Sequence, residues 1–155
     1  MVDIDIQKLS LSPLLVGLKP DELQAMVEAA EVVDYRGGEV IVAEGSPGDT
    51  MFMLCEGEVV VEKASPATGR PVLLATFTEP GDFFGEMVFV DVMPRSATVR
   101  AHLDARLMVF SLETLRRFCE ASKDVHLTIV LNIARMLSKR LRKADEMIAG
   151  SEGKE

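Results

Sequence analysis

The stretch Phe83–Val99 reads FFGEMVFVDVMPRSATV and sets Glu86 and Arg95 among apolar neighbours. Gly85 precedes a short apolar run that can form one or two helical turns, and a glycine there lets backbone N–H groups approach an anion closely. Arg95 follows Glu86 by nine residues, at the start of a predicted strand with small residues beside it. A guanidinium in such a place can bind a phosphate through two parallel hydrogen bonds.

Burying these two charges is costly unless each has a partner. A ligand that carries one anionic group and one hydroxyl donor would satisfy both Glu86 and Arg95. The alternative is a buried salt bridge between the two residues, in a domain that no longer binds a ligand.

Residues 32–111 are interrupted at short intervals by glycine, proline, aspartate and serine, which favour turns. Seven short apolar or alternating runs lie between these breaks and are expected to form strands. They are 32–35, 39–43, 50–55, 58–63, 72–77, 96–101 and 105–110. Because the segment has no helical crossover of βαβ length, the pattern indicates a sandwich or barrel rather than a parallel sheet.

The first thirty residues are expected to be mostly helical. Pro20 stands where the first position of a helix should be, and two acidic residues follow it, which suits the positive end of a helix. Leu23, Met26 and Val27 give this helix an apolar face.

The helical period returns after residue 110. Ser111 is a plausible N-cap for a helix that ends near Ser122. A longer helix is expected to start at residue 123 or 124 and to end near Ala149. Residues 151–155 are expected to form a disordered tail.

The long helix carries an apolar seam at alternating spacings of three and four residues, as in a coiled coil. The seam consists of Leu127, Val130, Ala134, Leu137, Leu141, Ala144 and Ile148. A second apolar row, formed by Ile129, Ile133 and Met136, occupies only the first half of the helix. We therefore expect the second row to pack on the β domain and the seam to form a homodimer through residues 124–149. The alternative is that both rows cover one monomeric core.

Composition limits the class of protein. The chain has 155 residues, of which 48% are apolar, and a net charge of −8. Its length suits one domain with a helical appendage, and its acidic balance argues against a nucleic-acid-binding surface. No run reaches the roughly 20 apolar residues that cross a bilayer, and the first eleven residues do not resemble a signal peptide. We expect a cytoplasmic protein that contacts no membrane.

Two motifs resemble the cyclic-nucleotide-binding domain family, which includes the catabolite activator protein, regulatory subunits of cyclic-AMP-dependent kinase and cyclic-nucleotide-gated channels. The first is Phe84-Gly85-Glu86 followed by Pro94-Arg95-Ser96-Ala97-Thr98-Val99, which is similar to the phosphate-binding cassette and has the kinase-like spacing between Glu and Arg. The second comprises residues 44–49, Phe52 and residues 56–61, which resemble the first hairpin region of the family.

The resemblance extends from about residue 11 to about residue 148 and implies an α+β fold. That fold is a β jelly roll, or double-stranded β-helix, with N-terminal helices and two C-terminal helices. The cyclic-nucleotide-binding domain would span residues 1–150, with the β roll at about 32–111 and the C-terminal helices at about 112–149.

The resemblance also implies a ligand site. Glu86 would accept a hydrogen bond from the ribose 2′-hydroxyl, and Arg95 would pair with an oxygen of the cyclic phosphate. Backbone N–H groups of Gly85, Glu86 and Ala97 would complete the phosphate cradle, and Ser96 would offer its hydroxyl. The expected cassette residues are Phe84, Gly85, Glu86, Met87, Arg95, Ser96 and Ala97.

Two features of the sequence bear on the identity of the base. In the family, threonine after the arginine tends to favour cyclic GMP and alanine cyclic AMP, while serine occurs in the catabolite activator protein, so Ser96 favours cyclic AMP and leaves cyclic GMP open. Alignment of the long helix places the base near Ala144 and Asp145. Asp145 could accept from the adenine amine, or it is simply a solvated helix charge; the activator protein has hydroxyl residues at these positions.

The cysteines, histidines and basic residues indicate no other chemistry. Cys55 and Cys119 are too few for a disulfide framework, and His102 and His126 are far apart without an acidic or cysteine cluster, so no metal or cofactor is expected. The basic run 139–143 is interpreted as a solvated helix face. No catalytic residues are expected, because no nucleophile is paired with a base and Glu86 has no second carboxylate as a partner.

The sequence therefore predicts a regulatory module, and no enzyme, that binds a cyclic nucleotide and signals by moving its C-terminal helices. No helix-turn-helix segment follows the long helix, so DNA binding is not expected unless the sequence is a fragment of a longer protein, and the output would be an unknown downstream protein. The alternative is an interaction or dimerisation module that keeps the fold without a ligand.

Overall fold

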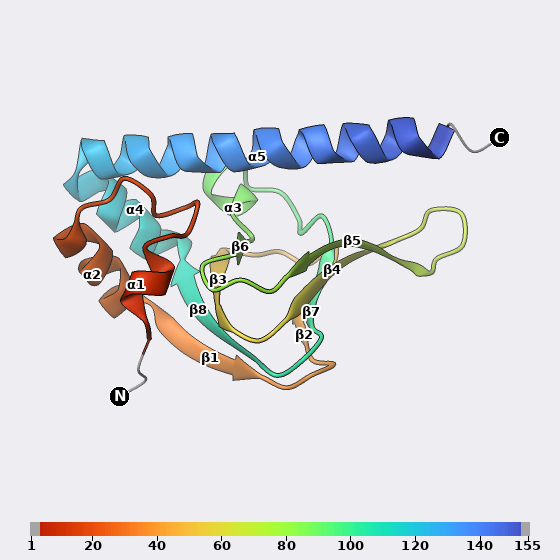
Figure 1. Cartoon of the computed structure of the whole chain (residues 1–155), viewed down its shortest axis with the longest axis horizontal. Helices are drawn as coiled ribbons and strands as arrows, with labels where there is room; N and C mark the ends of the chain where they lie inside the picture. The colour runs from red at the N-terminus through yellow and green to blue at the C-terminus, as the bar shows by residue number, and fades with distance from the viewer. Residues whose placement is uncertain (1–3, 153–155) are drawn as a thin grey trace.

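The computed structural model describes residues 4–152, which form two four-stranded antiparallel sheets and five helices (Figure 1). The first sheet has the order β1 (Glu31–Tyr35), β8 (Ala105–Ser111), β3 (Thr50–Glu56), β6 (Phe83–Phe84). The second has the order β2 (Val40–Val42), β7 (Thr98–Ala101), β4 (Val59–Ala64), β5 (Pro71–Phe77). The helices are α1 (Ile6–Leu9), α2 (Pro20–Ala29), α3 (Met87–Val90), α4 (Leu112–Ala121) and α5 (Lys123–Glu152).

The expected α+β jelly roll is confirmed, and each of the seven predicted strands is present with ends that differ by at most two residues. The eighth strand, β6, was missed. It has two residues, Phe83 and Phe84, which pair with Met53 and Phe52 of β3. So short a strand cannot display the alternation by which strands are recognised in a sequence.

Strand β3 is buried on both faces, and this explains its continuous apolar run. Met51 and Met53 belong to the cluster that the helices cover, whereas Phe52 and Leu54 belong to the cluster inside the roll. All four side chains are at most 5% exposed. Because successive residues of a strand point to opposite faces, one run of four apolar residues joins the two cores.

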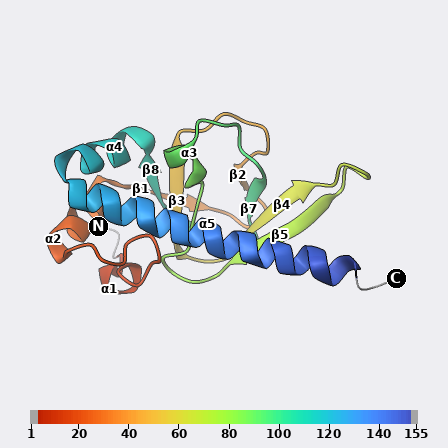
Figure 2. The same cartoon turned by 90° about the horizontal axis from the view of Figure 1, so that it is seen from above.

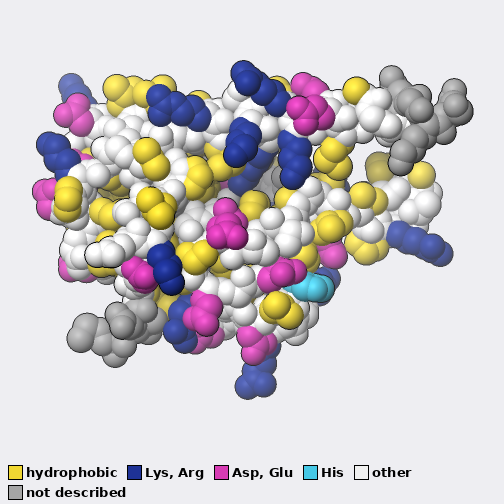
Figure 3. All heavy atoms as spheres, viewed as in Figure 1, with side chains coloured by type: hydrophobic (Ala, Val, Ile, Leu, Met, Phe, Trp, Pro, Cys, Tyr) yellow, Lys and Arg dark blue, Asp and Glu magenta, His cyan; other side chains and the backbone are white. Residues whose placement is uncertain are grey.

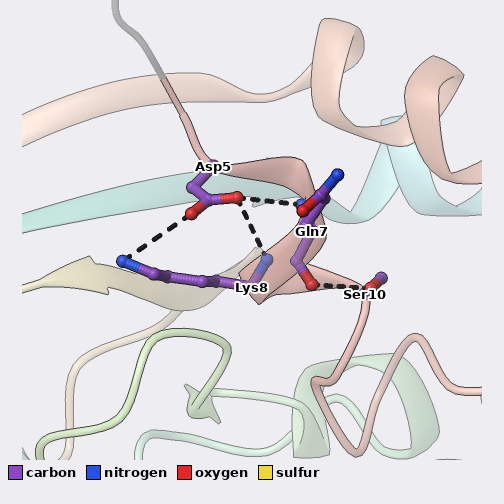
Figure 4. Close-up of polar contacts among 4 residues, drawn as sticks. All are labelled: Asp5, Gln7, Lys8 and Ser10. Carbon is purple, nitrogen blue, oxygen red and sulfur yellow. Dashed lines mark hydrogen bonds and ion pairs between the residues drawn. The ribbon is translucent and has the colours of Figure 1, made fainter.

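The N-terminal segment begins with a capped helix and is attached to α5. The carboxylate of Asp5 caps α1 by accepting from the backbone N–H groups of Gln7 and Lys8 (Figure 4). Further along, the buried amide of Asn132 on α5 donates to the carbonyl oxygens of Leu14 and Val16, both at 2.8 Å. These bonds fix the first half of α5 against the N-terminal segment.

The helix starts agree with expectation. Pro20 begins α2, and the hydroxyl of Ser111 accepts from the N–H of Thr114 at 3.0 Å to cap α4. The predicted end of the long helix near residue 149 is wrong, because α5 continues to Glu152. Residues 151 and 152 of the predicted tail are therefore helical, and residues 153–155 lie outside the described residues.

Helix α5 crosses one end of the roll, next to α3 and β6, and continues past β5 (Figures 1 and 2). Its buried side chains lie in the first half: Val125, Ile129 and Ile133 are at most 3% exposed. The second apolar row of the helix thus packs on the domain as expected.

Candidate functional site

A tight turn at Gly85 places Glu86 inside the protein. Strand β6 ends at Phe84, and α3 begins one residue after Glu86. Gly85 has φ +77°, a backbone conformation that residues with a Cβ atom rarely adopt. The turn directs the Glu86 side chain inward, where the residue is only 1% exposed.

The two carboxylate oxygens of Glu86 have different surroundings. Oε1 forms an ion pair with Nη1 of Arg140, which comes from α5. Oε2 is buried and has no hydrogen-bond partner within residues 4–152. Buried polar atoms nearly always have a partner, so an unpaired oxygen on a carboxylate marks a position for a donor.

Arg140 is held by four groups. Besides Glu86, its Nη2 donates to the carbonyl oxygen of Phe83 at 2.8 Å. Its guanidinium carbon lies 5.5 Å from the ring centroid of Phe77 and 5.7 Å from that of Phe83, within cation–π range. The interpretation of the basic run as a solvated face is therefore wrong for Arg140.

The sequence contained a signal for Arg140 that we did not use. Ile129, Ile133 and Met136 form the row that packs on the domain, and the next position of that row, four residues after Met136, is 140. An arginine that continues an apolar row can bury its stem and place its head group on a buried acid.

Arg95 lies against the start of β3. Its Nη2 donates to the carbonyl oxygen of Thr50 at 2.8 Å and to the Thr50 hydroxyl at 3.1 Å. Its backbone is fixed as well, because its N–H donates to Ser46 and its carbonyl accepts from Gly45. Residues 45–50 thus hold both the backbone and the side chain of Arg95.

Two glycines make room for the guanidinium. A Cβ atom at Gly48 would lie 2.1 Å from Nε of Arg95, and one at Gly85 would lie 2.9 Å from Nη1. Atoms this close cannot coexist, so the Arg95 side chain needs glycine on both sides. Thr50 and Gly48 are, like Arg140, site residues that sequence reasoning did not identify.

Charge and burial oppose each other at Arg95. Burial lowers the pKa of its guanidinium, while the negative charges of Asp49 and Glu86 raise it. Because arginine stays protonated in proteins, the site keeps a positive charge. The negative charge of Glu86 thus acts on Arg95. The two side chains form no ion pair with each other in the described structure, because Glu86 pairs with Arg140 and Arg95 bonds to Thr50. The alternative of a mutual salt bridge is therefore wrong.

The other expected cassette residues take varied positions. Phe84 is 3% exposed and its ring stacks on Phe52 at 5.0 Å, so only its backbone could meet a ligand. Met87 is half exposed on α3. Ser96 is exposed and its carbonyl accepts from Lys63, and Ala97 is partly buried. Ligand contacts by these residues remain predictions.

Ala144 and Asp145 lie on α5 beyond Arg140, and both are exposed. Ala144 is one helical turn after Arg140 and shares its face, whereas Asp145 is turned away from that line. Contacts of either residue with a base stay a prediction. Lys and Arg side chains gather on this half of α5 and in the space beneath it (Figure 3).

Two hollows lie away from Glu86 and Arg95. One, of about 500 Å³, lies between α1 and the turn after β3, and the other, of about 450 Å³, is bordered by α3, α4 and the start of α5. Within the described residues no group of three or more His, Cys, Asp or Glu side chains could hold a metal ion. No described helix is long and apolar enough to span a bilayer.

Comparison with known proteins identifies the family. The family model described as the cyclic nucleotide-binding domain matches residues 32–122, which cover α4 and all of the roll except the first residue of β1. The chain belongs to the cyclic nucleotide-binding domain family. The buried carboxylate and the arginine described above thus lie within the matched segment.

Relatives of several kinds share this domain. The chain is 27% identical over 141 residues to a CRP-like cAMP-activated global transcriptional regulator of Mycobacterium tuberculosis, a match that covers 91% of the chain and 60% of the regulator. It is 36% identical over 119 residues to a cyclic nucleotide-gated potassium channel of Mesorhizobium japonicum, covering 77% of the chain and 31% of the channel. It therefore spans less than two thirds of the length of these curated relatives.

Solved structures agree with the fold. The catabolite activator protein of Thermus thermophilus superposes with a TM-score of 0.78 at 28% identity, over 91% of the chain and 63% of that protein. A cyclic nucleotide-binding domain from Methylobacillus flagellatus superposes with a TM-score of 0.83 at 24% identity, over 94% and 83%. The likeness to the second structure is one of fold.

Proposed function

We propose that this domain binds a cyclic nucleotide, cyclic AMP in preference to cyclic GMP, between Glu86 and Arg95, and that it acts as a regulatory module and not as an enzyme. The observation that carries the proposal is the buried Oε2 of Glu86, which has no donor within the described residues. A ribose 2′-hydroxyl is a donor of the required kind. Arg95 supplies the positive charge for the cyclic phosphate.

The preference for cyclic AMP is supported by residue 96 and by the relatives. Ser96 replaces the threonine that tends to accompany cyclic GMP in the family. The regulator of M. tuberculosis is named as cAMP-activated, and a regulatory subunit of cAMP-dependent protein kinase from Aspergillus niger is 31% identical over 113 residues. A human cGMP-dependent kinase is also related, at 32% over 105 residues, so calorimetry must include both nucleotides.

The output of the module is a shift of α4 and α5. Helix α5 contacts the site directly through Arg140, and α4 joins β8 to α5. A ligand that binds one arrangement of these helices more tightly moves the population towards it. The downstream protein that reads this shift is unknown, and a cytoplasmic location stays an expectation.

The seam of α5 supports a homodimer. Leu127, Leu141 and Ile148 are each at least 60% exposed, whereas Leu137 packs against the core. A single chain thus leaves most of the seam uncovered. A second α5 in a coiled coil would bury it.

Calorimetry with cyclic AMP, cyclic GMP and 5′-AMP tests the proposal. We expect binding of the cyclic nucleotides only, and we expect Arg95→Lys to weaken it by about tenfold or more, because one charged hydrogen bond is worth roughly 1.5–3 kcal/mol. Arg117→Lys, at an exposed position of α4, is the matched control and should bind as the wild type does. Equal affinities for wild type and Arg95→Lys would refute the assignment of the site.

The ion pair of Glu86 with Arg140 also favours a second candidate, a ligand-free interaction module. In that case the carboxylate serves only to hold α5 on the roll. The two candidates differ in the same calorimetric experiment, since the second predicts no heat of binding with any cyclic nucleotide.

A further inference from the structure

The peptide group between Ser96 and Ala97 has a hydrogen-bond partner on one side only. Its carbonyl oxygen accepts a hydrogen bond of 2.5 Å from Nζ of Lys63, which comes from β4. Its N–H, which belongs to the partly buried Ala97, has no acceptor within residues 4–152. Because a peptide group is planar and trans, its C=O and N–H point in opposite directions. The bond to the carbonyl therefore sets the direction of the unpaired N–H.

Lys63 is held in turn by Glu44, which lies just after β2. Oε1 of Glu44 is 3.3 Å from Nζ of Lys63, and Oε2 accepts from the N–H of Ala64 at 3.0 Å. The bond from Ala64 and the contact with Lys63 lower the pKa of Glu44, so its carboxylate is ionised at neutral pH. A lysine ammonium rotates on a flexible stem unless it is anchored. The carboxylate and the Ser96 carbonyl together fix the ammonium.

The backbone on either side of this peptide group is held by the segment after β2. The carbonyl of Arg95 accepts from the N–H of Gly45 at 2.8 Å. The hydroxyl of Thr98 accepts from the N–H of Glu44 at 3.0 Å. The ammonium of Lys63 completes this support at the peptide group in between.

We propose that Lys63 is a positioning residue for recognition of the cyclic phosphate. Through the Ser96 carbonyl it aims the N–H of Ala97 at one exocyclic oxygen of the phosphate. Its positive charge also polarises the peptide group, which makes that N–H a stronger donor. The inference rests on the proposed function, and it gives Lys63 a role that needs no contact with the ligand.

The first test measures cyclic AMP binding by calorimetry in Lys63→Met, which keeps the apolar stem and loses the ammonium. We expect the affinity to fall about threefold to tenfold, the worth of one hydrogen bond that has lost its alignment. The Lys63 side chain is 46% exposed, so the fold should tolerate the change. Lys63→Arg can still donate to the carbonyl and should bind within about twofold of the wild type. Arg70→Met, at an exposed position between β4 and β5, removes the same charge and should bind as the wild type does.

The second test uses the two phosphorothioate diastereomers of cyclic AMP, in which sulfur replaces one or the other exocyclic oxygen. Sulfur is a weak acceptor, so one diastereomer lacks the bond from Ala97 in the wild type as well. Lys63→Met should leave the affinity for that diastereomer unchanged and should weaken the other about threefold to tenfold, as it weakens cyclic AMP. A purely structural role of Lys63, or a long-range attraction of the anion, would affect both diastereomers alike.

The third test asks whether Glu44 acts through Lys63. Glu44→Gln removes the charge that anchors the ammonium and keeps an acceptor for Ala64. It should weaken cyclic AMP binding about twofold to threefold, and it should add nothing in combination with Lys63→Met, because both changes act on the same peptide group. Additive losses would contradict this sequence of contacts.

The outcomes separate this inference from the proposed function. Unchanged binding of cyclic AMP by Lys63→Met, or equal losses for the two diastereomers, overturns the role of Lys63 and leaves the proposed function standing. If the wild type binds no cyclic nucleotide, the proposed function fails and this inference fails with it.

Discussion

Replacing Gly48 with alanine tests whether Arg95 must lie where the structure places it. The added Cβ would stand 2.1 Å from Nε and 2.4 Å from Cζ and Nη2 of Arg95, and ordinary contact begins near 3.4 Å. The guanidinium must therefore move by about 1.3 Å. A shift of that size breaks its hydrogen bonds to Thr50 and removes it from the position in which it meets the phosphate.

We expect Gly48→Ala to weaken the binding of cyclic AMP by about tenfold to a hundredfold, since a charged hydrogen bond contributes roughly 1.5–3 kcal/mol to binding. Stability should change little. The clash is with the far end of a flexible side chain, which can move, and the backbone at Gly48 is outside the left-handed region. Alanine also lowers the conformational entropy of the unfolded chain, which stabilises the folded protein by about 0.4–1 kcal/mol.

Calorimetry gives the affinity and thermal unfolding gives the stability. Gly37→Ala serves as the control, because Gly37 also lies outside the left-handed region and its Cβ would meet the His102 carbonyl at 3.2 Å, away from the site. A Gly48→Ala protein that binds cyclic AMP as the wild type does would show that Arg95 need not occupy this position. A protein that loses binding only because it unfolds would show that Gly48 serves stability instead.

Three further predictions concern the dimer, the core and a thiol. Leu141→Glu should convert the expected dimer to a monomer in light scattering, whereas Leu73→Glu on exposed β5 should not. Asn132→Ala leaves the carbonyls of Leu14 and Val16 without their donor and should lower the free energy of unfolding by about 2 kcal/mol. Calorimetric scans should then show a Tm lower by roughly 4–8 °C. Burial raises the pKa of Cys55 to about 11 from 9.0, so iodoacetamide at pH 8 should modify it about 100-fold more slowly than an exposed thiol. Folding favours the neutral thiol, because the pKa of Cys55 is higher in the folded protein. The folded protein therefore loses stability as the pH rises from about 9 to about 11.

The roll could be predicted because its signals are local. Glycine and proline mark the turns, and the run from Met51 to Leu54 predicts a strand whatever surrounds it. The core positions follow from the alternation of those residues between two faces. Strand β6 lacked such a signal, because two residues form a strand only by pairing with β3.

The sequence predicted which two charged residues form the site, Glu86 and Arg95, and it did not predict which residues they contact. Glu86 and Arg95 are marked by their apolar neighbours and by the glycine before Glu86. Their partners depend on which elements meet in space: Thr50 lies 45 residues before Arg95, and Arg140 lies 54 residues after Glu86. Only the packing of α5 across the end of the roll brings Arg140 to the acid, and a helical row shows which face is buried without naming the residue it meets.

The position of Arg140 on α5 sets how strongly the site can govern the helix. Every side chain from Leu141 to Ser151 is exposed, so Arg140 is the last half-buried side chain of α5 up to residue 151. Because about a third of it is exposed, its pair with Glu86 belongs at the lower end of the range for charged hydrogen bonds, roughly 1.5 kcal/mol, or about tenfold in a two-state equilibrium. A ligand hydroxyl that strengthens the hold by a similar factor would raise the docked fraction from about 90% to about 99%. The undocked fraction would fall about tenfold, so a partner that binds the free half of α5 would respond to the ligand more sharply than one that binds the docked half.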